Sequence, residues 1–274
     1  MPQTAISLLR IGTSSWTAPG WEGTFYAAST AKSQWIAEYA AKFSTVEIDA
    51  TFYRIPSRFI AEHWRDRTPE GFLFAAKAPK VITHDKFLVG CTEELTQFLD
   101  AMTILGPRLG PILFQFPYFA KKTEIGPATF RERLKSFLPS LPRGQFQFAV
   151  EVRNKTWLRK PLLDLLSYHG VALALIDHPW MPRPGQLFQQ AGIITGPFVY
   201  IRWLGDRGRI EEITQTWDRT VIDRREDMAE WLAPVKALLR DQIPVFGYFN
   251  NHYSGYAPAD ARAFLQMIQK EDNR

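Results

Sequence analysis

The sequence predicts a single (β/α)8 TIM barrel, and three observations lead to this fold class. Eight short apolar segments of strand type recur along the 274 residues. Segments in which apolar residues follow helical spacing separate most of these strands. Strands that alternate with helices form a parallel sheet, and eight such units close a barrel of about 250 residues. We therefore expect one TIM-barrel domain over residues 1–274.

The eight expected strands are short and mostly apolar. They are LLRIGT (8–13), TVEID (45–49), FLFAAK (72–77), PILFQF (111–116), QFAVE (147–151), VALALID (171–177), FVYIRW (198–203) and PVFGYFN (244–250). Helical spacing is present at 32–43, 57–67, 92–105, 128–141, 160–170, 223–242 and 257–269. An open doubly wound sheet is the alternative fold, but it usually begins with a GxGxxG turn, and GTSSWTAPGWEG (12–23) lacks that spacing.

One segment interrupts this alternation. Residues 179–197 contain four prolines and three glycines, so we expect a loop there with at most a short helix. The loop after the first strand is also long. Loops of this length in a compact domain are often functional.

The composition is that of a folded protein with an ordinary surface. The hydrophobic fraction is 46%, the charged fraction is 22%, and an aromatic fraction of 14% argues against disorder. The single cysteine, Cys91, excludes an internal disulfide, and the first residues lack the pattern of a signal peptide. We therefore expect a cytoplasmic protein. No apolar stretch approaches 18 residues, so we expect no membrane partner.

The charge balance favours an anionic ligand. Lys and Arg number 33 against 28 Asp and Glu, which gives a net charge of +5. The sequence has no dense basic stripe of the kind that a dedicated nucleic-acid binder carries. We expect a small anionic or phosphate-bearing ligand and leave nucleic acid open as a partner. The sequence sets no oligomeric state.

Polar side chains recur near the carboxyl end of every expected strand. Residues two apart in a strand share a face, so these side chains should converge on the barrel mouth, where TIM-barrel enzymes place their active sites. The set consists of Thr13, Ser15, Glu47, Asp49, Lys77, Gln115, Glu151, Arg153, Asp177, Arg202, Asn250 and Asn251. Buried ion pairs that hold the barrel together are the alternative reading, but such pairs add little net stability.

Charged members of this set have expected roles. Glu151 is the candidate general acid or base, because an adjoining arginine can hold it ionised while apolar neighbours limit water. Glu47 is a second catalytic candidate, or else the partner that keeps Lys77 charged. Lys77, grouped with the catalytic residues, should bind an anion together with Arg153 and Arg202, whose guanidiniums suit bidentate contacts.

Tryptophans form a second signal around the expected mouth. The tryptophans that follow strands or lie in the first loop are Trp16, Trp21, Trp157, Trp180 and Trp203. Flat rings at a cavity rim stack on sugars or on unpaired bases, although they can also simply cover the top of the barrel.

Metal and cofactor signals are weak. Asp177 precedes His178, and such a pair can bind a metal, but the chain has five histidines and one cysteine with little clustering. We therefore predict no cofactor and no metal ligands, with a divalent metal as an unsupported option. Residues 249–264 end the last strand in two amides and open a helix whose N-terminus is a potential anion site.

Seven ordered blocks carry a resemblance to a known family. They are GTSSWTAPGWEGTFYA, VEIDATFYRIPS, FAAKAPKVITHDK, LGPILFQFP, EVRNKTW, YIRWLGD and FNNHYSGYAPADAR. In this order they resemble the motifs of the YecE-like family, also called domain of unknown function 72, over nearly the whole chain. The resemblance implies a TIM barrel of bacterial and archaeal type, and it implies no established reaction.

The resemblance also marks recurrent family positions in this sequence. They fall on Trp16, Glu47, Thr51, Phe52, Tyr53, Lys77, Thr83, His84, Lys86, Gln115, Pro117, Glu151, Arg153, Trp157, Arg202, Asn250 and Asn251. Three positions depart from the family. It often has Gly where Ser15 stands, and His where Asn154 and Leu204 stand, so a mechanism that needs histidine at 154 or 204 is not expected here.

Three functions fit these observations. The first is an enzyme, such as a hydrolase or lyase, that acts on a phosphate-bearing substrate; with nucleic acid, the rim tryptophans and Tyr53 would stack on bases. The second is a glycoside-processing enzyme that uses paired carboxylates, which basic neighbours disfavour because they leave no acid. The third is a non-catalytic protein that binds single strands or a small anion.

Overall fold

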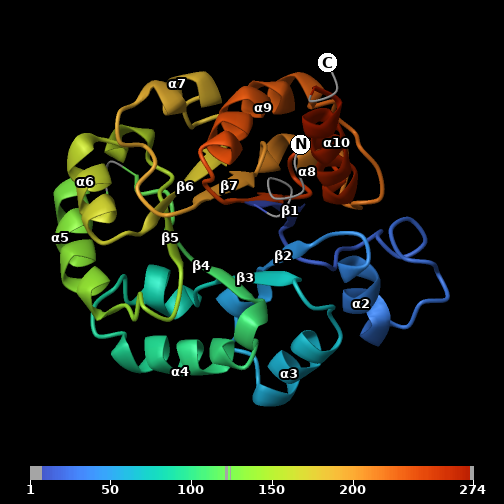
Figure 1. The fold of residues 1–274 in the computed structure, drawn as a ribbon, viewed down its shortest axis with the longest axis horizontal. Helices are drawn as coiled ribbons and strands as arrows, with labels where there is room; N and C mark the ends of the chain where they lie inside the picture. Colours follow the sequence, from blue (N-terminus) through green and yellow to red (C-terminus); the bar gives the residue numbers. More distant parts are fainter. Residues whose placement is uncertain (1–7, 121–122, 124, 272–274) are drawn as a thin grey trace.

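Eight parallel strands form one barrel (Figure 1), in a computed structural model that describes residues 8–120, 123 and 125–271. The strands are β1 (Leu9–Thr13), β2 (Thr45–Ile48), β3 (Leu73–Lys77), β4 (Leu109–Gln115), β5 (Phe148–Glu151), β6 (Ala172–Asp177), β7 (Val199–Trp203) and β8 (Val245–Phe249). Their order is β1-β8-β7-β6-β5-β4-β3-β2, and the paired strands are all parallel. The predicted TIM barrel is confirmed.

Helices cover the outside of the barrel (Figure 1) and fall in the predicted segments. They are α2 (Trp35–Ala40), α3 (Arg58–Asp66), α4 (Thr92–Thr103), α5 (Pro127–Phe137), α6 (Lys160–Tyr168), α9 (Arg225–Arg240) and α10 (Ala257–Glu271). The proline-rich stretch after β6 contains the short helix α7 (Pro184–Gln189), as expected. A further helix, α8 (Arg207–Ile213), was not predicted, because its seven residues bury one side chain, Ile210, and show no apolar period.

Short helical turns follow three strands at the barrel mouth. They are η2 (Ala50–Phe52) after β2, η3 (Val81–Asp85) after β3 and η6 (Lys155–Trp157) after β5. The turn η3 has π-helical hydrogen bonding, which is rare in proteins and frequent at functional sites. These turns hold the side chains that follow each strand close to the barrel axis.

The barrel closes between β1 and β2, where the two strands approach each other closely. The amide of Ser15 donates to the carbonyl of Glu47 at 2.8 Å, and Ser14 forms a parallel bridge with Glu47. A Cβ atom on Gly12 would lie 2.1 Å from the carbonyl oxygen of Thr45. Glycine is therefore required at position 12 for the seam to close.

The barrel interior is filled by side chains and is not a pore. Alanines on β3, β5 and β6 leave room for the rings of Tyr200 and Tyr248, whose centres lie 5.2 Å apart. The Tyr248 hydroxyl forms a 2.8 Å hydrogen bond with the hydroxyl of Thr45 across the barrel. Side chains of the opposite parity, such as Val46 and Ile48, pack on the helices. Ligands are thus excluded from the barrel centre and must bind above this layer.

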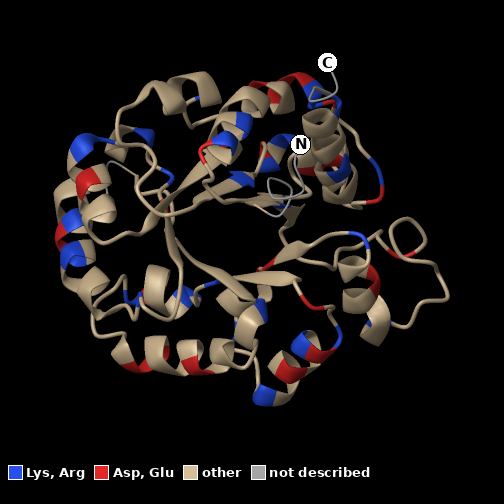
Figure 2. Ribbon diagram, in the orientation of Figure 1, with Lys and Arg blue, Asp and Glu red and all other residues tan. Residues whose placement is uncertain are grey.

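Charged residues of both signs are interspersed on the outer helices (Figure 2). In this view the described helices carry no broad face of a single sign, in agreement with the small net charge. Within the described ranges, no helix is long and apolar enough to cross a membrane.

The seam between β1 and β2 yields a stability prediction. Gly12→Ala places a methyl group against backbone, which cannot move without opening the barrel, so we expect a loss of at least about 3 kcal/mol in the free energy of unfolding. Gly185→Ala is the control, because a Cβ there meets no atom within 4 Å and lies within α7. Urea denaturation measures both. Equal stability of the two variants would contradict the close approach at the seam.

Candidate functional site

A row of alternating charges crosses the barrel mouth from β7 to β5. The Tyr200 hydroxyl donates to Oε2 of Glu47 at 2.6 Å. Arg202 then donates through Nη2 to Oε1 of Glu47 at 2.7 Å and through Nη1 to Oε2 of Glu151 at 2.7 Å. Arg153 Nε donates to Oε1 of Glu151 at 2.9 Å. These five residues are called the charge chain below.

Burial and pairing shift the pKa values of Glu151, Arg202 and Tyr200 in the charge chain. Glu47 and Glu151 are fully buried, and Arg202 is 2% exposed. Burial alone would raise the pKa of Glu151, but the charges and hydrogen bonds of Arg202 and Arg153 lower it to about 2. Burial would lower the pKa of Arg202, and the two carboxylates raise it well above its ordinary value. Burial, together with the charge of Glu47, raises the pKa of Tyr200, so the phenol remains a donor.

The hydrogen bonds within the charge chain disfavour proton transfer by either glutamate. All four carboxylate oxygens of Glu47 and Glu151 accept hydrogen bonds from within the chain. A general base works best when its pKa lies near the operating pH, and a pKa of about 2 makes Glu151 a weak base. The two residues lie where the sequence predicted, but their contacts favour an electrostatic role over a proton-transfer role.

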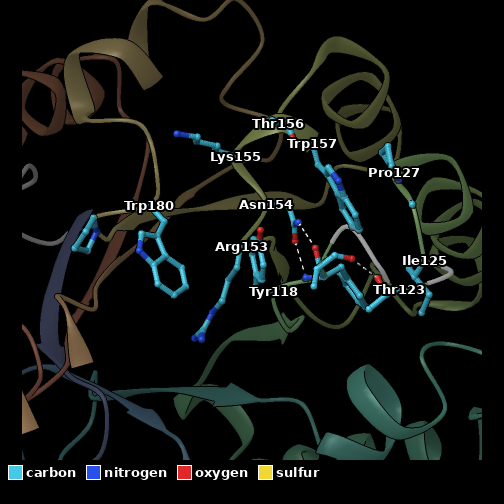
Figure 3. A pocket seen from close by; sticks show the side chains of 14 residues that line it. Tyr118, Thr123, Ile125, Pro127, Arg153, Asn154, Lys155, Thr156, Trp157 and Trp180 are labelled. Atoms are coloured by element: carbon cyan, nitrogen blue, oxygen red, sulfur yellow. Dashed lines mark hydrogen bonds between the residues drawn. The ribbon is translucent and has the colours of Figure 1, made fainter. Parts of the chain in front are cut away.

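Arg153 is the outer end of the charge chain and faces a large cavity. Its side chain is 38% exposed, and its two terminal nitrogens have no protein partner among the described residues. The cavity has a volume of about 660 Å³ and lies above the carboxyl ends of β4 and β5. In Figure 3 the Arg153 side chain lies beside Trp180 and Tyr118. A second cavity of about 60 Å³, which reaches Leu204, shares these three residues.

Lys77 begins a second polar group at the mouth. Its Nζ atom lies 3.0 Å from Oδ1 of Asp49 and 4.0 Å from the ring centre of Phe52. The ring of His84, in η3, packs edge-on against Phe52 at 5.0 Å between ring centres. The Nδ1 atom of His84 lies 2.8 Å from the hydroxyl of Thr83. Phe52 thus connects the lysine and the histidine.

Two histidines at the mouth are neutral at physiological pH. Burial lowers the pKa of His84, and the nearby charges of Lys77 and Arg153 lower it further, to about 4. Burial and Arg153 also lower the pKa of His178. A neutral imidazole can accept a proton from a substrate. Because its pKa is nearer to neutrality than that of Glu151, His84 is the stronger base of the two.

Two expected mouth residues lie on the other face of their strands. Asp177 pairs in register with Trp203, on the side that faces the helices. Its carboxylate accepts a 2.8 Å hydrogen bond from the indole of Trp231 in α9, and burial raises its pKa. Thr13 likewise bonds to the hydroxyl of Tyr39 in α2. Their expected convergence on the mouth is wrong, because the inward positions of β6 and β1 have the opposite parity.

The amides after β8 hold the loop that follows them. Asn250 accepts a 3.0 Å hydrogen bond from the amide of His252, and Asn251 accepts one of 3.0 Å from the amide of Ala257. The first amide of α10 is therefore occupied by a side chain. Gln115 points inward on β4 and donates to the carbonyl of Phe116.

The predicted rim aromatics divide into buried and exposed groups. Trp21 and Trp203 are fully buried in the helix layer and are not rim residues. Trp16 packs edge-on against a tryptophan of α3 at 5.4 Å, away from the large cavity. Trp157 is 8% exposed and forms a wall of that cavity, whereas Trp180 is 63% exposed.

Sequence reasoning missed several residues of the mouth. Tyr53 is exposed, as a stacking residue would be, but the large cavity is lined instead by Tyr118, which carried no signal in the sequence. Tyr200 carried a signal, since it lies two residues before Arg202 and shares its face. Ser14 faces the seam, and its hydroxyl is buried with no hydrogen-bond partner in the described structure.

No group of three or more His, Cys, Asp or Glu that could hold a metal ion is present among the described residues. Asp177 and His178, the two residues considered as a metal-binding pair, lie in different environments. Asp177 faces α9, and His178 lines the smaller cavity.

The low pKa of Glu151 predicts how stability depends on pH. An unfolded glutamate has a pKa of about 4.3, so the carboxylate stabilises the fold above that pH and its contribution is lost as the pH falls towards 2. We expect Glu151→Gln to lose about 3 kcal/mol at pH 7 and to show a shallower decline in stability between about pH 5 and pH 2. Denaturation at several pH values measures this. Glu132→Gln, exposed on α5, is the control; a wild-type slope in Glu151→Gln would contradict the assignment.

Comparisons of sequence find relatives over most of the chain. Residues 10–274 match the family described as "Protein of unknown function DUF72". The UPF0759 protein YecE of Escherichia coli (strain K12) is 33% identical over 157 residues, which are 56% of this chain and about half (51%) of that protein. The UPF0759 protein YunF of Bacillus subtilis (strain 168) is 27% identical over 282 residues and 96% of each chain.

Solved structures agree with this relationship. A DUF72 family protein of Thermotoga maritima has a TM-score of 0.73 and 25% identity, covering 97% of this chain and 99% of its own. A D-psicose 3-epimerase has a TM-score of 0.57 and covers 95% of this chain and 98% of its own, but at 12% identity it shows the fold alone. With the family match over residues 10–274 and a barrel shared with a solved member, this chain belongs to the DUF72 family.

Proposed function

We propose that this protein is an enzyme that acts on a phosphate-bearing substrate, and that Arg153 binds the phosphate at the barrel mouth. The observation that carries the proposal is the position of Arg153. One nitrogen is fixed by Glu151, the two terminal nitrogens have no partner among the described residues, and the residue lines a cavity of about 660 Å³. A guanidinium held in this way can form a bidentate contact with an oxyanion at little cost in side-chain entropy.

The surrounding charges support an anion at this place. Burial is the main cause of the lowered pKa of His84, and the charges of Lys77 and Arg153 lower it further, which supports a positive potential near the imidazole. Lys155 lines the same cavity as Arg153 and adds a third cation. An anionic group that enters the mouth would be attracted from several sides.

His84 is the proposed proton-transfer residue. Its Nδ1 atom contacts Thr83, and its Nε2 atom has no partner among the described residues. A phosphate bound near Arg153 would favour the imidazolium and raise the pKa of His84 from about 4 towards the range of effective acid–base catalysts. Binding of the substrate would thereby prepare the residue for catalysis.

The two other functions receive less support from the site. A glycoside-processing enzyme needs one carboxylic acid that holds a proton, and Glu47 and Glu151 both hydrogen-bond to Arg202 as its counter-ions. A non-catalytic anion-binding protein would use Arg153 in the same way but would have no need of His84. The role of His84 therefore distinguishes an enzyme from a binding protein.

Arg153 can be tested by direct binding. We expect Arg153→Met to weaken the binding of inorganic phosphate and of ribose 5-phosphate by about 10- to 100-fold, measured by isothermal titration calorimetry at pH 7. Arg240→Met is the matched control, because Arg240 is exposed at the C-terminal end of α9. Equal affinities in the wild type and Arg153→Met would rule out the proposed phosphate site.

The role of His84 predicts a separation of turnover from binding. In a panel of phosphomonoesters and phosphodiesters, with products followed by phosphate release and mass spectrometry, we expect His84→Gln to lower kcat by about 100-fold or more. Its dissociation constant for ribose 5-phosphate should change little. Unchanged kcat would refute the assignment, and binding without turnover by the wild type would favour the binding protein.

A further inference from the structure

We infer that the phosphate-bearing ligand of this site also carries a planar aromatic ring, so that the mouth recognises a nucleoside phosphate. The inference rests on the proposed function and adds the chemical class of the ligand. It follows from the walls of the 660 Å³ cavity, a volume within the range of small-molecule sites.

Aromatic rings form much of the cavity wall. Trp157 stacks on Phe119 with ring centres 5.2 Å apart and planes 10° apart, so the two rings form a rigid face. Tyr118 and Trp180 also line the cavity and are 52% and 63% exposed, which is unusual for such large rings. Exposed rings of this kind stack on the flat faces of bases.

The geometry places a ring beside the phosphate site. Tyr118 and Trp180 contact each other with ring centres 6.0 Å apart and planes 61° apart, so a base does not fit between them and would stack on an outer face. Arg153 lies beside these two residues in Figure 3 and lines both cavities with them. One ligand can therefore reach the guanidinium and an aromatic face together.

The polar groups of the cavity favour stacking over recognition of a particular base. The amide of Asn154 is occupied on both sides, because it donates to the carbonyl of Phe119 at 2.8 Å and accepts from the amide of Phe119 at 3.0 Å. Ile125 and Pro127 add an apolar wall that offers no hydrogen-bond partner, and the remaining polar lining comes from Thr123, Lys155 and Thr156. Recognition by stacking accepts any base.

Calorimetry with four ligands of matched chemistry tests the inference. The ligands are inorganic phosphate, ribose 5-phosphate, adenosine 5′-monophosphate and adenosine. We expect adenosine 5′-monophosphate to bind about tenfold more tightly than ribose 5-phosphate, the contribution of one stacked base. Equal affinities for these two ligands would overturn the inference.

Variants locate the ring-binding face. We expect Trp180→Ala or Tyr118→Ala to abolish the tenfold preference for adenosine 5′-monophosphate while the affinity for ribose 5-phosphate is retained. Tyr168→Ala is the control, because Tyr168 is 85% exposed on α6 and lines neither cavity. A preference that survives in both cavity variants would overturn the inference.

The same experiment separates this inference from the proposed function. If ribose 5-phosphate and adenosine 5′-monophosphate bind equally and both depend on Arg153, the proposed phosphate site stands and the ring site fails. If no phosphate compound binds, or Arg153→Met has no effect, both fail. A single-stranded trinucleotide that binds more tightly than adenosine 5′-monophosphate would support the inference and identify a nucleic-acid strand as the source of the base. Equal or weaker binding of the trinucleotide would support the inference and identify a free nucleotide as the ligand.

Discussion

The mouth of this barrel depends on one buried guanidinium that is shared by two carboxylates. Arg202 connects Glu47 on β2 with Glu151 on β5, residues that lie 155 and 51 positions away in the chain. Removal of any one of these groups would leave a buried charge uncompensated. Since a buried ion pair adds little net stability over apolar packing, the arrangement is better explained by what it positions than by what it stabilises. It positions Arg153, the exposed end of the charge chain.

The small side chains of the barrel interior determine the direction from which a ligand can reach Arg153. Because alanines surround Tyr200 and Tyr248, the two rings fill the barrel centre below the charge chain. A ligand cannot enter along the barrel axis and must lie over the loops that follow β4, β5 and β6. Arg153 follows the last residue of β5 by two positions and lines the cavity together with residues of those loops.

The sequence predicted the barrel and the centre of the charge chain for a common physical reason. In a strand, side chains alternate between two faces, so a charge on one face of an otherwise apolar strand marks a buried charged face, as at Glu47, Glu151 and Arg202. The same rule failed at Asp177 and Thr13, because a polar residue at a strand end can also face the helices. The choice of face requires a known interior neighbour, such as the alanines of β6.

Other properties of the site depend on contacts that no local pattern contains. The sequence placed an arginine beside Glu151, but the low pKa also requires Arg202 from a distant strand, and this changes the carboxylate from a candidate base into a counter-ion. Burial of loop tryptophans is equally non-local, since Trp157 is covered by Phe119 while Trp180 is open.

Two positions at which this sequence departs from the motifs it resembles, Asn154 and Leu204, line the cavities at the mouth. Asn154 lines the larger cavity and holds the backbone of Phe119, while Leu204 lines the smaller one. The motifs that the sequence resembles imply histidine at these positions, and a histidine would add a titratable group on either side of Arg153. In this chain an amide and an apolar side chain occupy these positions, and the histidines whose pKa is lowered by burial and by the charge of Arg153 are His84 and His178.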